Sequence, residues 1–499
     1  MPGEGPAEGL LELLTRSDGH PALIDSGTDD RITYAELHEI VVRVGGQVAG
    51  LGVQPGDVVA LIAPNGPGLV AMFLALASAG GAVAPLNPAY KRAELESYLA
   101  DLRPTTMLLD ETAGDDARLA CASLEIPIHR FAGGEARALT LEGVQPERVS
   151  GDPDADAVAL LLHTSGTTGS PKGVPIRQRN LTASARTIGA SYRLGSRDVS
   201  YCVMPLFHVH GLVASVLSAL ASGGSVVIPR RFSASAFWQD VARYGATWFS
   251  AVPTIHRTLA LRDDHDVESA STLRFARSCS SALPVTVWER FEAKFGVALV
   301  EAYGMTEAAH QMASNPLPPD ERRPGTVGRA TGVDVAILDD DWNELPSGAA
   351  GEVAVRGASV VDGYRDAPEA NAASFRDGWF RTGDQGALSA DGYLTLEGRI
   401  KELINRGGEK ISPHEIEDAL LSHPAVVEAV AFALPDEKYG EQVGAAVVTR
   451  SELGSAELAA HCADRLAKFK VPNRIEIVDE IPKGPTGKVQ RRLIAGLLD

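Results

Sequence analysis

Short apolar runs alternate with segments of helical length in the first half of the chain, and this alternation restricts the possible folds most strongly. The β-branched run Val58–Ala63 ends at a Pro-Asn-Gly turn. The Ala-rich segment Leu69–Ala79 then has helical length and stops at Gly80–Gly81, and a second apolar run begins at Ala82–Pro85. Strand–helix–strand spacing of this kind is typical of parallel βαβ units, so we predict an α/β fold of layered helices and strands.

The alternation returns further along the chain and then gives way to a different pattern. Related segments recur at Tyr201–Met204, Val213–Ala221, Ser225–Pro229, Thr247–Val252 and Ala298–Glu301. After Asn315, Gly, Pro and Asp become frequent, and the runs Val333–Leu338 and Glu352–Arg356 are typical of antiparallel strands. We therefore expect a β-rich subdomain at about residues 316–399, within an N-terminal domain that spans residues 1–399.

The last hundred or so residues form a new αβ pattern. Its expected elements are a helix at Pro413–Leu421, strands at Val426–Phe432 and Val443–Val448, and a helix at Ala456–Leu466. A segment of this length is sufficient for a small domain with its own core. We predict a separate C-terminal α+β domain over residues 400–499.

Composition and charge exclude several classes of protein. The chain has 499 residues, of which 44% are hydrophobic and 22% charged, as in a globular protein. Its net charge of −19 opposes binding to a phosphate backbone, and the basic cluster Lys488–Arg492 is short, so nucleic acid is not the expected partner. The four cysteines lie far apart without a CxxC pair, which argues against structural zinc and a disulfide framework. We expect a cytoplasmic protein, because no secretory signal or run of 18 apolar residues is found.

The most specific local feature is a strand that runs into a loop of small residues. Leu160–Thr164 is followed by Ser-Gly-Thr-Thr-Gly-Ser-Pro and then Lys172 and Gly173. Glycines let a backbone approach phosphate closely, hydroxyls and N–H groups donate to its oxygens, and the lysine adds a positive charge. The order of residues differs from a Walker A loop. The alternative is a flexible polar loop between a strand and a helix.

This loop resembles the phosphate loop of the ANL superfamily of adenylate-forming enzymes, which includes acyl-CoA synthetases, luciferases and peptide-synthetase adenylation domains. Seven further segments match the pattern of that superfamily in the same order: Pro205–His208, Tyr303–Glu307, Gly351–Val353, Trp379–Asp384, Gly398–Glu402, Gly407–Ser412 and Pro485–Lys488. The match runs from about residue 25 to the end of the chain. Arg277–Ser281, His310–Pro318 and Arg399–Lys410 resemble, more specifically, oxalate–CoA ligases of plants and fungi.

The resemblance implies a two-step reaction with ATP, Mg²⁺ and coenzyme A. A carboxylate first joins AMP as a mixed anhydride, and a thiol then attacks the carbonyl. By resemblance, Lys488 is the adenylation lysine that bridges the acid and the α-phosphate. Two unit charges about 4 Å apart interact by about 4 kcal/mol at an effective dielectric constant near 20, so one lysine can change the rate by orders of magnitude. The alternative is a solvated surface lysine.

The resemblance also assigns the nucleotide and CoA sites. Thr306 would bind the α-phosphate, and Glu307 would hold Mg²⁺ as a hard oxygen ligand. Tyr303 would offer its ring to adenine, Asp384 would accept from the ribose hydroxyls, and Arg399 would contact ribose or phosphate. A core tyrosine and a structural ion pair are the alternatives for these three residues. The full expected set is Thr164, Ser165, Gly166, Thr167, Thr168, Lys172, Ser281, Glu301, Ala302, Tyr303, Asp384, Arg399, Lys401, Gly407 and Gly408.

Two further implications concern movement of the C-terminal domain. Lys401 occupies the hinge position of the superfamily, so the C-terminal domain is expected to rotate between the half-reactions. Lys488 would then leave the site, and Gly407–Gly408 would replace it beside the CoA channel.

Acetylation of Lys488 by a lysine acyltransferase would remove its charge and stop adenylation.

The expected acid pocket is polar. His208 resembles the aromatic gate of the superfamily, and Ser280 and His310 stand where many relatives have small or apolar residues. An unpaired buried polar group costs about 1–3 kcal/mol, so a fatty chain fits poorly and a short dicarboxylate fits well. We therefore expect Ser280 and His310 to bind the distal carboxylate of oxalate. The alternative for His310 is a core histidine.

Other interpretations remain open. The alternative substrates are malonate, a medium-chain acid and an aromatic acid, and the alternative class is a non-catalytic nucleotide-binding regulator. His208 and His210 are two residues apart, but no third ligand cluster is near them, so a metal site is disfavoured. Cys279 has no recognisable base partner and is expected to be a small buried residue.

Overall fold

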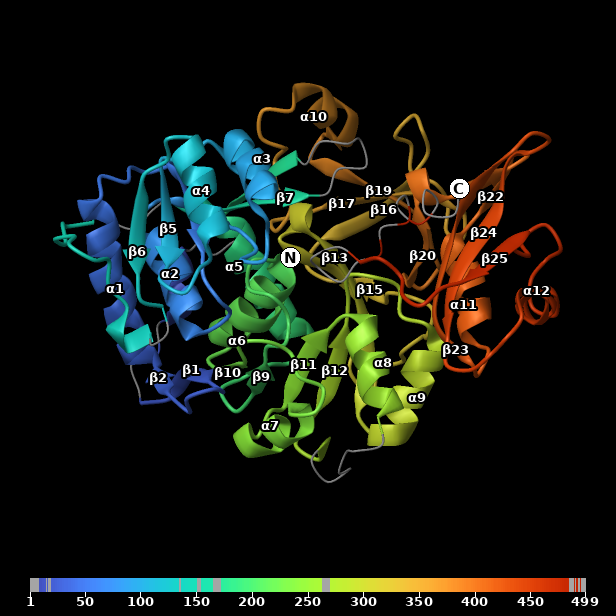
Figure 1. Cartoon of the computed structure of the whole chain (residues 1–499), viewed down its shortest axis with the longest axis horizontal. Helices are drawn as coiled ribbons and strands as arrows, with labels where there is room; N and C mark the ends of the chain where they lie inside the picture. Colours follow the sequence, from blue (N-terminus) through green and yellow to red (C-terminus); the bar gives the residue numbers. More distant parts are fainter. Residues whose placement is uncertain are drawn as a thin grey trace.

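The computed structural model describes residues 9–14, 16, 19–133, 136–149, 154–164, 172–262, 270–483, 489, 491 and 494. These residues form mixed α/β layers, as the alternating pattern predicts. Figure 1 shows α1 (Tyr34–Gly50) at one end of the molecule and α12 (Ser455–Ala463) at the other. Within the described residues, no helix is long and apolar enough to cross a membrane.

The first sheet has six strands and confirms the predicted βαβ units. Its order is β6 (Ile128–Phe131), β5 (Thr106–Asp110), β3 (Val58–Ile62), β4 (Ala82–Pro85), β7 (Val158–Thr164) and β8 (Lys172–Arg177). Helices α1 (Tyr34–Gly50), α2 (Pro67–Ser78), α3 (Arg92–Leu102) and α4 (Asp115–Ser123) belong to the same part of the chain. All residues of α2 are buried, as expected for a helix that is apolar on every side. The strands are parallel except β8, which runs antiparallel to β7.

The second sheet has nine strands. Its order is β15 (Arg329–Ala330), β14 (His310–Ser314), β13 (Ala298–Met305), β12 (Phe275–Ser278), β11 (Trp248–Ala251), β9 (Val199–Tyr201), β10 (Ser225–Ile228), β1 (Pro21–Asp25) and β2 (Arg31–Thr33). The six strands from β13 to β1 run parallel, with antiparallel strands at both edges. In this register Ser278 lies opposite Glu301, so the residues that follow β12 lie beside the end of β13.

The helices of this second layer differ slightly from expectation. They are α5 (Gln178–Ser191), α6 (Ser218–Ala221), α7 (Phe237–Tyr244), α8 (Pro253–Leu261) and α9 (Val285–Phe295). The segment expected at Val213–Ala221 begins earlier, as the π-helix η3 (His210–Leu217), and continues as α6. The strand β9 ends at Tyr201, before most of the run Tyr201–Met204. Wider π-turns are common at functional sites, which directs attention to His210 at the start of η3.

The β-rich region is confirmed as an antiparallel sheet. It contains β16 (Asp334–Leu338), β17 (Gly351–Arg356), β18 (Phe375–Arg376), β19 (Trp379–Leu388) and β20 (Leu394–Arg399), with α10 (Pro368–Ser374) before β18. Its long strand β19 pairs with β17, β18 and β20. Residues far apart in the sequence, such as Glu352 and Gln385, therefore become direct neighbours.

The C-terminal region forms a further sheet with its own core. Its elements are β21 (Ile404–Arg406), β22 (Glu409–Ile411), α11 (Pro413–Leu421), β23 (Val426–Asp436), β24 (Gly440–Thr449), α12 (Ser455–Ala463) and β25 (Arg474–Ile477). The two central strands are longer than expected, because they form a continuous hairpin from Val426 to Thr449. Ile404, Ile416, Val447 and neighbouring residues make the core. The boundary at residues 399 and 400 stays a prediction.

Arg491 ties the end of the chain to this sheet. Its guanidinium forms an ion pair with Glu417 on α11, Nε lies 3.1 Å from Glu402 Oε2, and Nη1 donates to the Ala431 carbonyl at 3.1 Å. Burial alone would raise the pKa of Glu417, but Arg491 and His414 together hold it at about 2. Arg491 follows Lys488 by three positions, so this ion pair anchors the chain close to the predicted adenylation lysine.

Replacing Arg491 with Met should destabilise the protein, because Glu417 would remain buried without its cation. Breaking a buried pair in this way costs about 3–5 kcal/mol. The measurement is urea unfolding of the full chain, with Arg465→Met as the control, since Arg465 is exposed and its guanidinium donates to the His461 carbonyl. Combining Arg491→Met with Glu417→Gln should recover part of the loss. An unfolding midpoint equal to that of the control would contradict the anchoring role.

Candidate active site

Three predicted nucleotide residues meet because Tyr303, near the end of β13, reaches the paired strands β19 and β20. Asp384 and Arg399 lie opposite each other in the β19–β20 register, with Arg399 Nε 2.9 Å from Asp384 Oδ1. The Tyr303 hydroxyl donates to Asp384 Oδ2. Burial, and then the charge of Asp384, raises the pKa of Tyr303 well above its usual value, so the hydroxyl keeps its proton. The ion pair between Arg399 and Asp384, which is the alternative expected from the sequence, is present.

The ion pair is compatible with the ribose role of Asp384. A carboxylate offers about four lone-pair positions, and Arg399 and Tyr303 each use one on a different oxygen. These two contacts are therefore compatible with acceptance from ribose hydroxyls. Tyr303 packs among apolar residues that include Met312 and Val353, and its hydroxyl holds Asp384. The roles of these residues toward a nucleotide stay predictions.

The ends of the phosphate loop are held by two antiparallel strands. Thr164, the last residue of β7, lies opposite Lys172, the first residue of β8. A second strand, not a helix, follows the loop, so the expected placement between a strand and a helix is wrong. Whether the loop binds phosphate or is only a flexible polar loop stays a prediction. Ser165, Gly166, Thr167 and Thr168 fall outside the described residues, as does Lys488. Their roles remain predictions from the sequence.

Tyr364 connects the phosphate loop to the predicted magnesium ligand. The Lys172 ammonium lies 4.7 Å from the centre of the Tyr364 ring, and the Tyr364 hydroxyl donates to Glu307 Oε1 at 2.9 Å. Burial and the charge of Glu307 raise the pKa of Tyr364, so it remains a neutral donor. Nothing in the sequence around Tyr364 points to the site, since the residue follows Glu307 by 57 positions and meets it only in the fold.

The segment around Tyr364 is itself fixed on both sides. The Val361 N–H donates to the Glu307 carbonyl at 2.8 Å, and the Arg365 N–H donates to the Gly173 carbonyl at 2.9 Å. Residues 361–365 therefore bridge the turn that carries Glu307 and the strand that carries Lys172. This brings a cation and a carboxylate together, as ATP and Mg²⁺ require.

The donor set fits a magnesium ion that is shared with a nucleotide. Mg²⁺ usually takes one or two carboxylates together with substrate phosphates. Glu307 is buried and supplies such a carboxylate, while the described residues contain no cluster of three or more His, Cys, Asp or Glu that would hold a metal alone. Thr306, half-buried, begins the turn η5 (Thr306–Ala308) beside Glu307.

The acid-pocket residues Ser280 and His310 are brought together through His210. Ser280 Oγ lies 2.9 Å from His210 Nδ1, and His210 Nε2 lies 2.7 Å from Ser250 Oγ. The His210 and His310 rings meet edge to face, with centroids 5.1 Å apart. Both histidines are buried. His210 is an addition to the predicted set, and its place at the start of the π-helix is the local feature that marks it.

The backbone is strained where it presents two of these side chains. Ser280 has φ +79° and His310 has φ +118°, in the region that non-glycine residues rarely adopt. At Gly304 a Cβ would lie 1.9 Å from the His310 carbonyl oxygen, so only glycine allows β14 to approach β13 this closely. Strain of this kind persists only where the surroundings impose it, and it clusters at functional sites.

The remaining predicted residues near β13, and His208, each lie in different surroundings. His208 is half-buried beside Phe207, with ring centroids 5.1 Å apart, just before η3. Glu301 Oε1 accepts from the Leu283 N–H at 2.9 Å, which ties β13 to the loop after Ser280. Burial raises the pKa of Glu301 to about 8, so this carboxyl is largely neutral at pH 7. Ser281 is exposed three residues after the end of β12, and Ala302 is buried opposite Ser314.

The expected hinge and CoA residues lie at the start of the C-terminal region. Lys401 is exposed in the turn Ile400–Glu402. Gly407 and Gly408 form the tip of the β21–β22 hairpin with φ of 61° and 98°, which favours glycine at both positions. The Gly407 N–H donates to the Tyr439 carbonyl of the same domain at 2.8 Å. Their roles in movement and CoA binding stay predictions.

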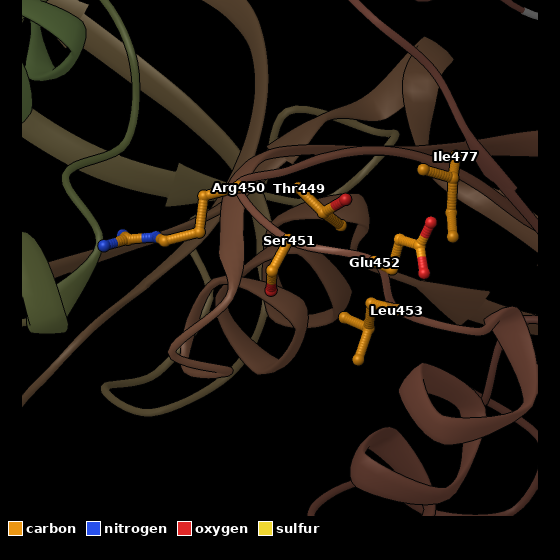
Figure 2. A pocket seen from close by; sticks show the side chains of 6 residues that line it. All are labelled: Thr449, Arg450, Ser451, Glu452, Leu453 and Ile477. Atoms are coloured by element: carbon orange, nitrogen blue, oxygen red, sulfur yellow. The ribbon is translucent and has the colours of Figure 1, made fainter.

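A separate cavity of about 420 Å³ lies in the C-terminal domain. Figure 2 shows its lining side chains, Thr449, Arg450, Ser451, Glu452, Leu453 and Ile477. The predicted site residues are not among them.

All four cysteines, including Cys279, are buried and unbonded to one another, as expected for Cys279.

The family models match both parts of the chain. The AMP-binding enzyme model matches residues 12–365, and the AMP-binding enzyme C-terminal domain model matches residues 415–488. The chain therefore belongs to the AMP-binding enzyme family. It is an ATP-dependent acid–CoA ligase that forms an acyl-adenylate and uses ATP, Mg²⁺ and coenzyme A.

Known relatives and a solved structure cover nearly the whole chain. An oxalate–CoA ligase of Arabidopsis thaliana is 44% identical over 98% of this chain and 97% of its own. A sulfoacetate–CoA ligase of Cupriavidus necator is 41% identical over 94% of this chain and 93% of its own. The ATP-bound structure of MatB from Rhodopseudomonas palustris has a TM-score of 0.90 and 31% identity, with 98% of each chain covered. The predicted fold class is confirmed.

Replacing Tyr364 with Phe should weaken magnesium-dependent adenylation. The variant keeps the ring beneath Lys172 and loses the hydrogen bond to Glu307, so we expect about a tenfold lower rate. The magnesium concentration for half-maximal rate should rise, while the KM for the acid stays constant. Pyrophosphate release at varied magnesium is the measurement, with Tyr393→Phe as the control, since that hydroxyl bonds the Glu321 carbonyl. An unchanged magnesium dependence would show that Tyr364 does not position Glu307.

Proposed function

We propose that this ligase converts oxalate, ATP and CoA into oxalyl-CoA, AMP and diphosphate. The observation that supports this most directly is the polar group formed by half-buried Ser280 with buried His210 and His310. A hydrocarbon chain offers no hydrogen bond to such groups, whereas a short dicarboxylate offers several acceptors. The proposal also fits the similarity to an oxalate–CoA ligase over nearly the whole chain.

Some residues of the site would bind the nucleotide, and others would bind the acid. Asp384, held by Arg399 and Tyr303, would orient the ribose, and Lys172 would face the phosphates. Glu307, held by Tyr364, would bind Mg²⁺, which offsets negative charge on the phosphates. Lys488 would offset the repulsion between the acid and the α-phosphate. Ser280 and His310 would bind the distal carboxylate, with His208 as the gate.

A second candidate substrate is another small acid with two anionic groups. The similarity to a sulfoacetate–CoA ligase favours this alternative, since sulfoacetate carries a sulfonate as well as a carboxylate. Medium-chain and aromatic acids, and a non-catalytic regulator, follow as less favoured alternatives. Control of the enzyme through acetylation of Lys488 and a cytoplasmic location stay predictions.

A panel of acids tests the proposed reaction. Pyrophosphate release is measured with ATP, Mg²⁺ and CoA for oxalate, sulfoacetate, malonate, acetate, octanoate and coumarate. We expect the largest kcat/KM for oxalate, because it fits a small polar pocket. A preference for octanoate or coumarate would retain the ligase and overturn the polar-pocket argument. If no acid in the panel gives pyrophosphate release, the non-catalytic alternative is favoured.

The pocket itself is tested by substituting His310. The variant His310→Ala should lose about 10- to 100-fold in kcat/KM for oxalate, because a hydrogen bond to a charged group is worth about 1.5–3 kcal/mol. ATP binding should change little. His310→Gln can place an amide N–H near the position of Nε2 and should recover part of the activity. Full oxalate turnover by His310→Ala would show that the pocket assignment is wrong.

A further inference from the structure

Arg277 is a fully buried arginine behind the acid pocket. It lies on β12, three residues before Ser280, and is 0% exposed. Its guanidinium donates to Tyr192 Oη at 2.9 Å, to Gln311 Oε1 at 3.0 Å and to Ser250 Oγ at 2.8 Å. All three of these acceptors are neutral groups, so they satisfy hydrogen bonds without cancelling the charge.

The charge of Arg277 is not balanced by a neighbouring carboxylate. Among the ion pairs formed by the described residues, none includes Arg277, whereas Arg274 at the start of the same strand pairs with Asp198 at 2.5 Å. Buried charges are normally paired, because removing an ion from water costs several kcal/mol. A buried guanidinium with only neutral partners therefore makes its surroundings electropositive, and those surroundings include the acid pocket.

Two hydrogen-bonded routes connect Arg277 with the pocket. One is direct, because Arg277 Nη2 lies 3.3 Å from His310 Nδ1. The other passes through Ser250 Oγ, which bonds both Arg277 Nη1 and His210 Nε2, and His210 in turn bonds Ser280. The same guanidinium thus reaches both side chains that are expected to hold the distal end of the acid.

The direct contact determines which nitrogen of His310 carries the proton. A guanidinium only donates hydrogen bonds, so His310 Nδ1 accepts and the ring proton lies on Nε2. The other titratable groups that face Arg277 are Tyr192 and Cys279, and both are buried. Nε2 is therefore the nitrogen through which His310 donates.

We propose that Arg277 is a positioning residue that makes the pocket selective for short acids with a second anionic group, either a carboxylate or a sulfonate. Arg277 acts through His310 and the Ser250–His210–Ser280 chain and supplies the positive charge that the second anion balances. The inference deepens the proposed function and rests on its assignment of the pocket. It extends to the whole class of two-anion acids and so does not depend on oxalate alone.

The test compares acids that differ only in the second charge. Oxalate is paired with oxamate, and sulfoacetate with methylsulfonylacetate, so that one anionic group becomes neutral at similar size. Affinity is measured by calorimetry on the full chain with a non-hydrolysable ATP analogue and Mg²⁺. We expect the wild type to bind at least one dianion at least tenfold more tightly than its neutral-ended partner. Arg277→Met should reduce this ratio to below threefold.

Two further variants separate charge from packing. Arg277→Lys keeps the charge and should keep most of the ratio, while turnover falls because the contact with His310 Nδ1 is altered. Arg274→Met removes a paired arginine next to the same strand and should leave the ratio unchanged. Melting temperature and affinity for the ATP analogue are recorded for every variant. If Arg277→Met does not fold, the Lys variant decides, since loss of the ratio there contradicts a role for the charge.

The outcomes distinguish this inference from the proposed function. A wild type that prefers dianions but turns over only sulfoacetate would overturn oxalate as substrate and support the role of Arg277. A wild type with equal affinity for each pair would overturn the role of Arg277 whichever acid is turned over. A preserved ratio in folded Arg277→Met would overturn it as well.

Discussion

The parallel alignment of β11, β12 and β13 is the constraint on which the rest of the site depends. Parallel strands end at the same edge of a sheet, and ligands of open α/β sheets bind at that edge. The register of Ser278 with Glu301 therefore places the Ser280 loop beside the turn that carries Glu307. The antiparallel return of β14, possible because residue 304 is glycine, adds His310 to the same place. One edge thus holds the acid pocket and the phosphate end of the nucleotide site.

Negative groups near this edge are each compensated in a different way. Asp384 is paired with Arg399, and Glu301 is kept largely neutral by burial, which raises its pKa to about 8. Glu307 accepts from Tyr364, and its role as a metal ligand stays a prediction. The whole chain carries a net charge of −19, so attraction of an anionic acid and ATP depends on local cations. Lys172 and the buried Arg277 are two such cations among the described residues.

The sequence predicts the elements of this arrangement better than their contacts. Apolar runs such as Val58–Ile62 and Ala82–Pro85 become parallel strands because their pattern is local. His210, Arg277 and Tyr364 acquire their roles only through partners 40, 33 and 57 residues away, in Ser250, His310 and Glu307. No local periodicity records such distances. The loop residues Ser165–Thr168 and Lys488 are the reverse case, since their motifs are informative and they lie outside the described residues.

The position of Arg399 shows how a moving domain and a fixed nucleotide site can coexist. Arg399 is the last residue of β20, and its partner Asp384 lies on the neighbouring strand β19. Lys401, the expected hinge, comes two residues later, beyond the end of that sheet. A rotation about Lys401 would therefore leave the pair of Arg399 and Asp384 intact, while it moves Arg491 and the chain attached to it together with Glu417. The ribose contact would persist through both half-reactions, and only the groups beyond Lys401 would exchange.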